Sequence, residues 1–328
     1  MEPREIIKRT LDYDGPDRVG HTFGDSDLVG VECTPITHAT DWEQLGDGTW
    51  RRTDEWGNTW RRLDRSSKGE VAKGVLESLD DIEKYEFPDY SRPEDYEVVK
   101  AAREKDPDKW IMGLMPGFAF NIARKLRKLD QYLMDIVTDR EKVSAVHDRV
   151  DLVLEDMIKN YARAGADSVF FLEDWGTQQN LMINPKMWKE EFFPRYVKLC
   201  DLARTEGIRV SMHSCGKIAS IIPWVMEAGV ELLQFDQPDL YGIDNLREFQ
   251  KMGKITFWCP VDIQTTLQTR DENVIREKAR QMLDKLWRGE GGFVAGYYED
   301  NESIGLDPKV QGWASDEFEK YGVKDNFR

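Results

Sequence analysis

A histidine and a cysteine stand two positions apart at the end of an apolar run in the segment SMHSCGKI, residues 211–218. Alternate residues of a β-strand point to the same side, so His213 and Cys215 can face one site. Imidazole and thiolate are ligands that Zn²⁺ prefers, and a catalytic zinc site keeps one position open. The pair therefore predicts a zinc site, with Cys259 of the segment FWCPVD as a third ligand. The alternative is a hydrogen-bonded core histidine beside ordinary buried thiols.

Carboxylates and aromatic rings follow other apolar runs. Glu173 and Asp174 end one run, and since adjacent residues point opposite ways, only one of them is expected to face the site. Glu173 is the candidate here, as a metal ligand or reacting carboxylate, with a solvated loop acid as the alternative. Asp236 ends another run. Aromatic rings near such ends could bind an apolar substrate, although rim packing is the commoner role of any single ring.

The second half of the chain repeats the order of helix end, glycine, apolar strand and polar residues. Five segments share it: YARAGADSVFFLEDWG, LARTEGIRVSMHSCGK, VMEAGVELLQFDQPDL, FQKMGKITFWCPVDIQ and LWRGEGGFVAGYYED. Apolar strands separated by helices predict a parallel sheet buried on both faces. In a (β/α)8 barrel all strand ends converge on one mouth, whereas an open sheet gathers ligands mainly at one switch point. The pattern favours an α/β fold of the TIM-barrel type.

The first half supplies the remaining elements. DRVGHTFGD and KWIMGLMPGFAF are predicted barrel strands, and residues 69–76 are the candidate for the missing one. TWRRTDEWGNTWRRL alternates around a Gly-Asn pair, which predicts an N-terminal β-hairpin added to the barrel. Residues 184–204 are a predicted helix, with Asn184 as N-cap. No linker or low-complexity stretch appears, so residues 1–328 are expected to form a single domain.

Composition excludes several classes of partner. The formal net charge is -16 and the pI is about 4.9, so phosphate-rich partners such as nucleic acids or anionic membranes would be repelled. No run approaches the roughly 18 apolar residues that a membrane span needs. The N-terminus has no apolar signal-peptide region, and four scattered cysteines make no disulfide framework. A reducing, cytoplasmic location is expected.

Several motifs resemble one known family. DWGTQQNLMINPKMWKEEFFPRYVKLCDLAR, HSCGKI, FDQPD and the opening EPREIIKRTLDYDGPDRVG are similar to the uroporphyrinogen decarboxylase superfamily. The similarity is greatest to its corrinoid-dependent methyltransferase branch, which includes O-demethylases, and it implies a (β/α)8 barrel. Thiol-methylating members bind zinc through His-x-Cys and a cysteine at the last strand. His213 and Cys215 match the first two ligands, whereas the last strand here, AGYYED, has no cysteine. True decarboxylases carry an arginine-rich RQAGR-type stretch, where this chain has HTFGDSDLVG.

The resemblance implies methyl transfer from a small methylated compound, for which methoxylated aromatics are candidates, to a corrinoid on a separate small protein. Zinc would assist by polarising the leaving oxygen. A homodimer is an option for the assembly. Two alternatives stay open: a cofactor-independent decarboxylase of the uroporphyrinogen type and a non-catalytic binding barrel. The expected catalytic residues are His213, Glu173 and Asp236. The expected substrate-binding residues are Trp175, Gln178, Phe118, Tyr297 and Tyr298.

Overall fold

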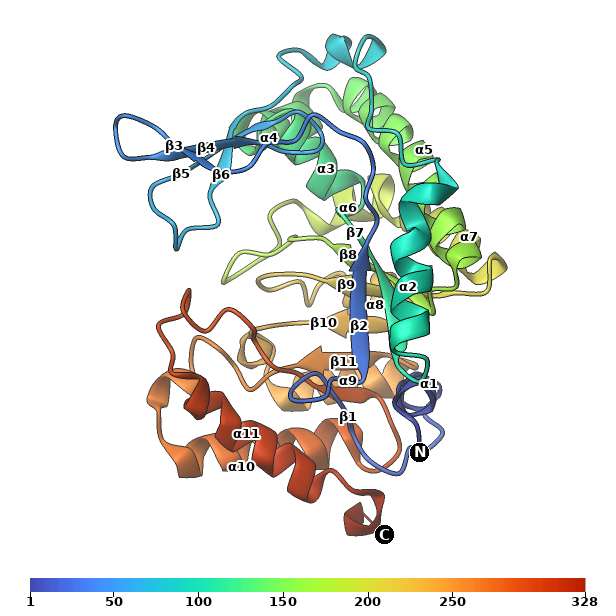
Figure 1. The fold of residues 1–328 in the computed structure, drawn as a ribbon, viewed down its shortest axis with the longest axis vertical. Helices are drawn as coiled ribbons and strands as arrows, with labels where there is room; N and C mark the ends of the chain where they lie inside the picture. The colour runs from blue at the N-terminus through green and yellow to red at the C-terminus, as the bar shows by residue number, and fades with distance from the viewer. Residues whose placement is uncertain (328) are drawn as a thin grey trace.

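The computed structural model describes residues 1–327, and its central element is a curled sheet of eight parallel strands (Figure 1). Their order is β1-β12-β11-β10-β9-β8-β7-β2. Apolar β-branched and aromatic residues dominate these strands, and β8, with the sequence SVFFL, is buried at all but its last residue. The strands are β1 (Gly20–His21), β2 (Leu28–Glu32), β7 (Trp110–Met115), β8 (Ser168–Leu172), β9 (Arg209–His213), β10 (Leu232–Gln234), β11 (Thr256–Cys259) and β12 (Phe293–Ala295).

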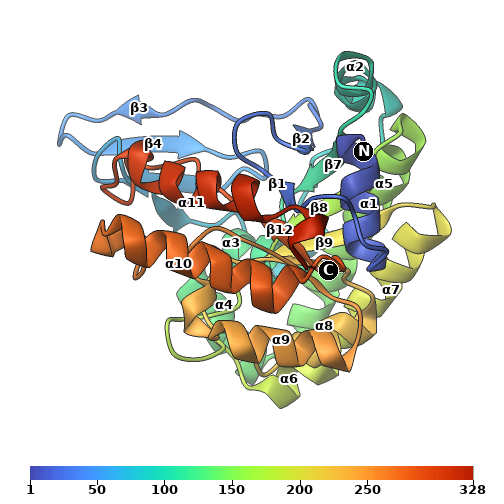
Figure 2. The same cartoon turned by 90° about the horizontal axis from the view of Figure 1, so that it is seen from below.

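From β7 onward, helices connect successive strands of this sheet, as the repeated sequence order predicts. In Figure 2, α10 and α11 lie side by side near the C-terminus. Within residues 1–327, no helix has both the length and the apolar character to cross a membrane. The helices are α1 (Pro3–Asp12), α2 (Glu97–Lys105), α3 (Ala119–Leu126), α4 (Leu129–Thr138), α5 (Arg140–Ala164), α6 (Pro185–Glu191), α7 (Phe193–Thr205), α8 (Ile222–Ala228), α9 (Ile243–Met252), α10 (Glu272–Met282) and α11 (Pro308–Tyr321).

The helix predicted over residues 184–204 is two helices, α6 and α7. Its predicted start is confirmed, because the Asn184 side chain accepts a hydrogen bond from the backbone N–H of Lys186. The break at Phe192 immediately precedes Phe193 and Pro194. Proline has no N–H to donate and its ring clashes with the preceding turn, so it is tolerated at the start of a helix but not inside one.

The large sheet resembles a TIM barrel but is not closed by a strand ladder. β1 and β2 lie at the two ends of the strand order, and no ladder joins them within residues 1–327. They are connected directly, without a helix, and the Asp27 N–H donates to the His21 carbonyl at 2.9 Å. The expected (β/α)8 barrel is therefore present in the coarser form of a curled parallel sheet with helices. Its strand ends still face one side, where polar residues collect.

The predicted hairpin forms part of a larger antiparallel sheet that projects beside the main one (Figure 1). β4 (Trp50–Thr53) and β5 (Thr59–Arg62) pair with each other, and β3 (Glu43–Gln44) and β6 (Glu70–Lys73) flank them. The prediction that residues 69–76 contain a barrel strand is wrong. Glu70–Lys73, with the sequence EVAK, is mostly exposed, so it lacks the apolar surface of a buried parallel strand. β2 takes that place in the large sheet.

Candidate metal and catalytic site

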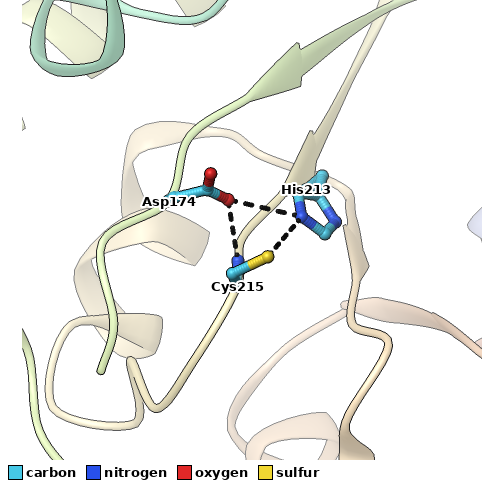
Figure 3. Close-up of side chains that lie close together, drawn as sticks. All are labelled: Asp174, His213 and Cys215. Atoms are coloured by element: carbon cyan, nitrogen blue, oxygen red, sulfur yellow. Dashed lines mark hydrogen bonds and ion pairs between the residues drawn. The ribbon is translucent and has the colours of Figure 1, made fainter. Parts of the chain in front are cut away.

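Three side chains capable of binding a metal meet beyond the ends of β8 and β9: Asp174, His213 and Cys215 (Figure 3). One donor atom from each lies within 4.8 Å of the others. His213 Nε2 is 3.4 Å from Asp174 Oδ1 and 3.2 Å from Cys215 Sγ. A carboxylate, an imidazole and a thiol are all zinc ligands, and three protein ligands leave a fourth position open, as in catalytic zinc sites.

Two glycines allow the loops that carry these ligands to touch. A Cβ atom on Gly176 would lie 2.4 Å from the Lys217 nitrogen, and one on Gly216 would lie 2.3 Å from the Gly176 carbonyl carbon. Gly216 also has a φ of +70°, which is left-handed backbone. The Gly176 N–H donates to the Cys215 carbonyl at 3.1 Å. The glycines after DW and SC therefore permit the close approach that puts Asp174 beside Cys215.

A chain of hydrogen bonds orients the histidine. Gln234 Nε2 donates to Asp236 Oδ1 at 2.8 Å, which leaves the amide oxygen of Gln234 facing His213 Nδ1. Because a carboxylate only accepts, this orientation of the amide is required. The Nδ1–H of His213 then donates to Gln234, so Nε2 is the nitrogen available to a metal. Asp236 acts on the site through Gln234.

The site favours a positive charge. Burial alone would lower the pKa of His213, but its bonds to Asp174 and Cys215 outweigh burial and raise the pKa well above its usual value. Burial alone would likewise raise the pKa of Asp174, yet the His213 hydrogen bond and the charges of His213 and Arg124 hold that pKa well below its usual range. Arg124 Nη2 is 3.3 Å from Asp174 Oδ2. The same three side chains would therefore favour either a proton on His213 or a divalent cation in its place.

The triad borders a hollow large enough for a small molecule. One part has a volume of about 560 Å³ and is lined by the triad, Asp236 and Tyr298, among others. A neighbouring part of about 660 Å³ shares Lys68, Leu172 and Asp174 with it, so the two belong to one hollow. These volumes lie in the usual range for ligand sites.

Two predicted site residues lie elsewhere. Cys259 is fully buried and does not belong to the group of three. Glu173 is also fully buried, and its Oε1 accepts a hydrogen bond from the Asn121 N–H at 2.9 Å. Burial raises the pKa of Glu173 to about 8. Glu173 thus holds the start of α3 rather than lining the hollow, and its neighbour Asp174 faces the site.

Of the predicted substrate-binding rings, only Tyr298 lines the hollow beside the triad. Phe118 is buried and stacks on Phe171 at 3.7 Å between ring centroids. Trp175 is fully buried, and its Nε1 donates to Tyr196 Oη at 2.9 Å. Both rings belong to the core, which is neither the expected substrate-binding role nor the alternative of packing at the rim.

The other two predicted substrate-binding residues lie near the hollow. Gln178 is exposed, and its Nε2 donates a hydrogen bond of 2.9 Å to Gln237, which lines the hollow. Tyr297 is half-buried, and its hydroxyl accepts a hydrogen bond from Asn301 at 3.2 Å.

Sequence analysis missed the roles of Asp174 and Gln234. The sequence placed Asp174 beside Glu173 as one of two candidates, and the contact of Gly176 with the HSCG loop, which only the structure shows, is what turns Asp174 toward the site. Gln234 gave no signal, since a glutamine inside the apolar run VELLQF is not a metal ligand type.

Replacing Asp174 with asparagine is expected to weaken zinc binding at least about tenfold. Loss of a residue that only hydrogen-bonds to a metal ligand typically costs that much, and loss of the ligand itself should cost no less. Cys259→Ser is expected to leave zinc affinity unchanged, as is Cys200→Ser in α7. Competition with a chromogenic chelator measures all three variants. A larger loss in Cys259→Ser than in Asp174→Asn would return Cys259 to the site.

A family model and one solved structure match most of this chain. A family model described as uroporphyrinogen decarboxylase (URO-D) matches residues 63–297. A solved methyltransferase from Methanosarcina mazei is similar over 98% of this chain and 86% of that chain, with a TM-score of 0.60 at 13% identity. A 3-keto-D-glucoside 4-epimerase from E. coli covers 68% of this chain and 85% of its own, with a TM-score of 0.43 at 11% identity. No curated protein sequence matches. The family match spans most of the chain, and the chain belongs to the uroporphyrinogen decarboxylase (URO-D) family.

Proposed function

We propose that the protein is a metal-assisted methyltransferase that moves a methyl group from a small methylated compound to a corrinoid carried by a separate protein. The observation that supports this most strongly is the group of Asp174, His213 and Cys215 beside the hollow. The similarity to the solved methyltransferase agrees with it. Methoxylated aromatics are the leading candidates for the methyl donor.

The residues of the triad fit zinc. Their three donor types match its preferences, and their charges favour a cation at this point. Bound there, zinc would supply Lewis-acid polarisation of an ether oxygen, which makes a phenolate or alkoxide a better leaving group. Gln234 and Asp236 would keep His213 Nε2 directed at the metal, and Arg124 would hold the free oxygen of Asp174.

The chain itself would bind and orient the donor. Tyr298 and Phe235 line the hollow next to the triad and could pack against an aromatic ring. The exposed position of Cys215 leaves the site accessible to a corrinoid brought by a partner. A corrinoid delivered by the partner would supply the cobalt(I) nucleophile that accepts the methyl group from the carbon–oxygen bond. Asp174, His213 and Cys215 would hold the cation that stabilises the released phenolate or alkoxide, which would take a proton from water.

The test combines the purified, zinc-loaded protein, free cob(I)alamin and a series of methylated compounds. Conversion of cob(I)alamin to methylcobalamin, followed by absorbance, would support the proposal. The protein without corrinoid should consume none of these compounds. Failure to methylate cobalt with methoxylated aromatics, methylamines and betaines alike would favour a binding protein without catalysis.

Uroporphyrinogen is not expected to be decarboxylated, despite the family name. Such a substrate carries many carboxylates and needs several cations. Four cations line the described part of the hollow. Arg124 and Lys128 already form ion pairs with Asp174 and Asp130, so Lys68 and Lys125 are the two lining cations without an ion-pair partner among residues 1–327. Steady formation of coproporphyrinogen by the purified protein, followed by chromatography, would contradict this expectation.

A further inference from the structure

Lys125 presents an unpaired cation to the hollow. It lies in α3, next to Arg124, and lines the part of the hollow that also contains Asp174. Within the described residues 1–327, its ammonium makes neither an ion pair nor a hydrogen bond, and its one polar contact is with the Trp60 ring, 5.7 Å from the centroid. Most other cations that line this part have a carboxylate partner. The Lys125 side chain is half-buried, and an ammonium that has lost part of its water without gaining a counter-ion is destabilised.

Burial lowers the pKa of Lys125, chiefly because the ammonium loses water and secondly because Arg124 repels it. The acids that act in the opposite direction, Glu55, Asp54 and Asp174, are too distant to form an ion pair with it. A carboxylate placed beside the ammonium would supply the missing partner.

Trp60 gives this part of the hollow an aromatic wall of fixed orientation. Its Nε1 donates to Asp54 Oδ2 at 2.6 Å, so the ring is held toward the turn between β4 and β5. The ring lines the same space as Lys125 and Asp174. An aromatic ring beside a cation, in a space that Asp174 also lines, suits a flat ligand with an anionic end.

We infer that Lys125 is a specificity-determining residue that binds a carboxylate of the methyl donor, so that the donor is an organic acid. The carboxylate pairs with Lys125, the body of the donor lies along Trp60, and the methylated end reaches Asp174, His213 and Cys215. The volume of about 660 Å³ accommodates a donor of one aromatic ring. The inference rests on the proposed function for the role of the methylated end, but not for the binding of the carboxylate.

The chain's negative net charge makes a local cation necessary for holding an organic anion. The protein carries a formal net charge of -16, so an organic anion is repelled at long range and needs a local cation to be held. Lys68 lies at the junction of the two parts of the hollow. Burial alone would lower the pKa of Lys68, but Tyr298, Asp300 and Asp236 outweigh burial and raise that pKa, whereas the acids around Lys125 do not outweigh its burial. Lys125 is therefore the cation best placed for the ligand.

Equilibrium binding tests the inference without any turnover. The zinc-loaded protein at pH 7 is titrated calorimetrically with 4-methoxybenzoate and with its neutral analogue, 4-methoxybenzamide. The wild type should bind the carboxylate about tenfold more tightly, as expected for a hydrogen bond to a charged group. Lys125→Met, which keeps the apolar stem, should abolish this preference, and Lys125→Arg should retain most of it.

Lys73→Met is the matched control, because Lys73 lies in β6 outside the hollow and pairs with Glu77 at 2.7 Å. It removes the same charge and should keep the preference. Equal affinity of the wild type for both compounds, no measurable binding of either, or a preference that survives in Lys125→Met would each overturn the inference. These results are separate from the corrinoid assay: a carboxylate preference without cobalt methylation would refute the proposed function and leave the role of Lys125 standing.

Discussion

The double variant His213→Ala/Cys215→Ala is expected to lose its zinc. The wild type should bind about one zinc per chain, because one donor atom from each of three residues lies within 4.8 Å of the others. Removing two of these ligands leaves Asp174 alone, and a single carboxylate cannot hold zinc against a chelator. Elemental analysis after dialysis, together with competition titration, measures the loss.

The control for this variant removes the same residue types elsewhere. His38 is exposed and Cys200 is buried in α7, away from the triad. The double variant His38→Ala/Cys200→Ala should therefore keep its zinc. Circular dichroism shows whether each protein is folded. Full zinc content in the folded His213→Ala/Cys215→Ala protein would remove the metal site from this part of the molecule.

The single variant His213→Ala is expected to slow methyl transfer to cob(I)alamin by about 100-fold or more. Polarisation of the leaving oxygen is worth several kcal/mol and acts mainly in the transition state, and each 1.36 kcal/mol corresponds to tenfold in rate. Asp236→Asn, which changes the hydrogen-bond partner of Gln234 and not a metal ligand, should slow the step less, by about 10-fold. Single-turnover absorbance of the corrinoid gives both rates.

A substitution in the lining of the hollow should behave differently. Tyr298→Leu is expected to raise KM more than it lowers kcat, because this ring lines the hollow but is not one of the metal ligands. If His213→Ala reacted as fast as the wild type while Tyr298→Leu lost kcat, the chemistry would have to be assigned to another part of the hollow.

Local sequence pattern determined much of this molecule. Strand period, helix caps and the recurring glycine are properties of short segments, and they predicted the run of strands and helices from β7 onward, the cap at Asn184 and the hairpin of β4 and β5. The two-residue spacing of His213 and Cys215 likewise predicted that they lie together, and Nε2 and Sγ are 3.2 Å apart. These features depend on neighbours along the chain.

Only the tertiary structure decided which other residues complete the site. Alternation predicted that one of Glu173 and Asp174 faces the site, but both residues follow the last residue of β8. The loop that contacts Gly216 turns Asp174 toward the site, while Glu173 accepts a hydrogen bond from the backbone of α3. Cys259 ends β11 as expected, yet it is buried and remains outside the group of three. Gln234 and Lys125 acquire their roles from contacts with residues distant in sequence. Such contacts depend on how loops and helices pack in three dimensions, and residue type and spacing along one chain do not encode them.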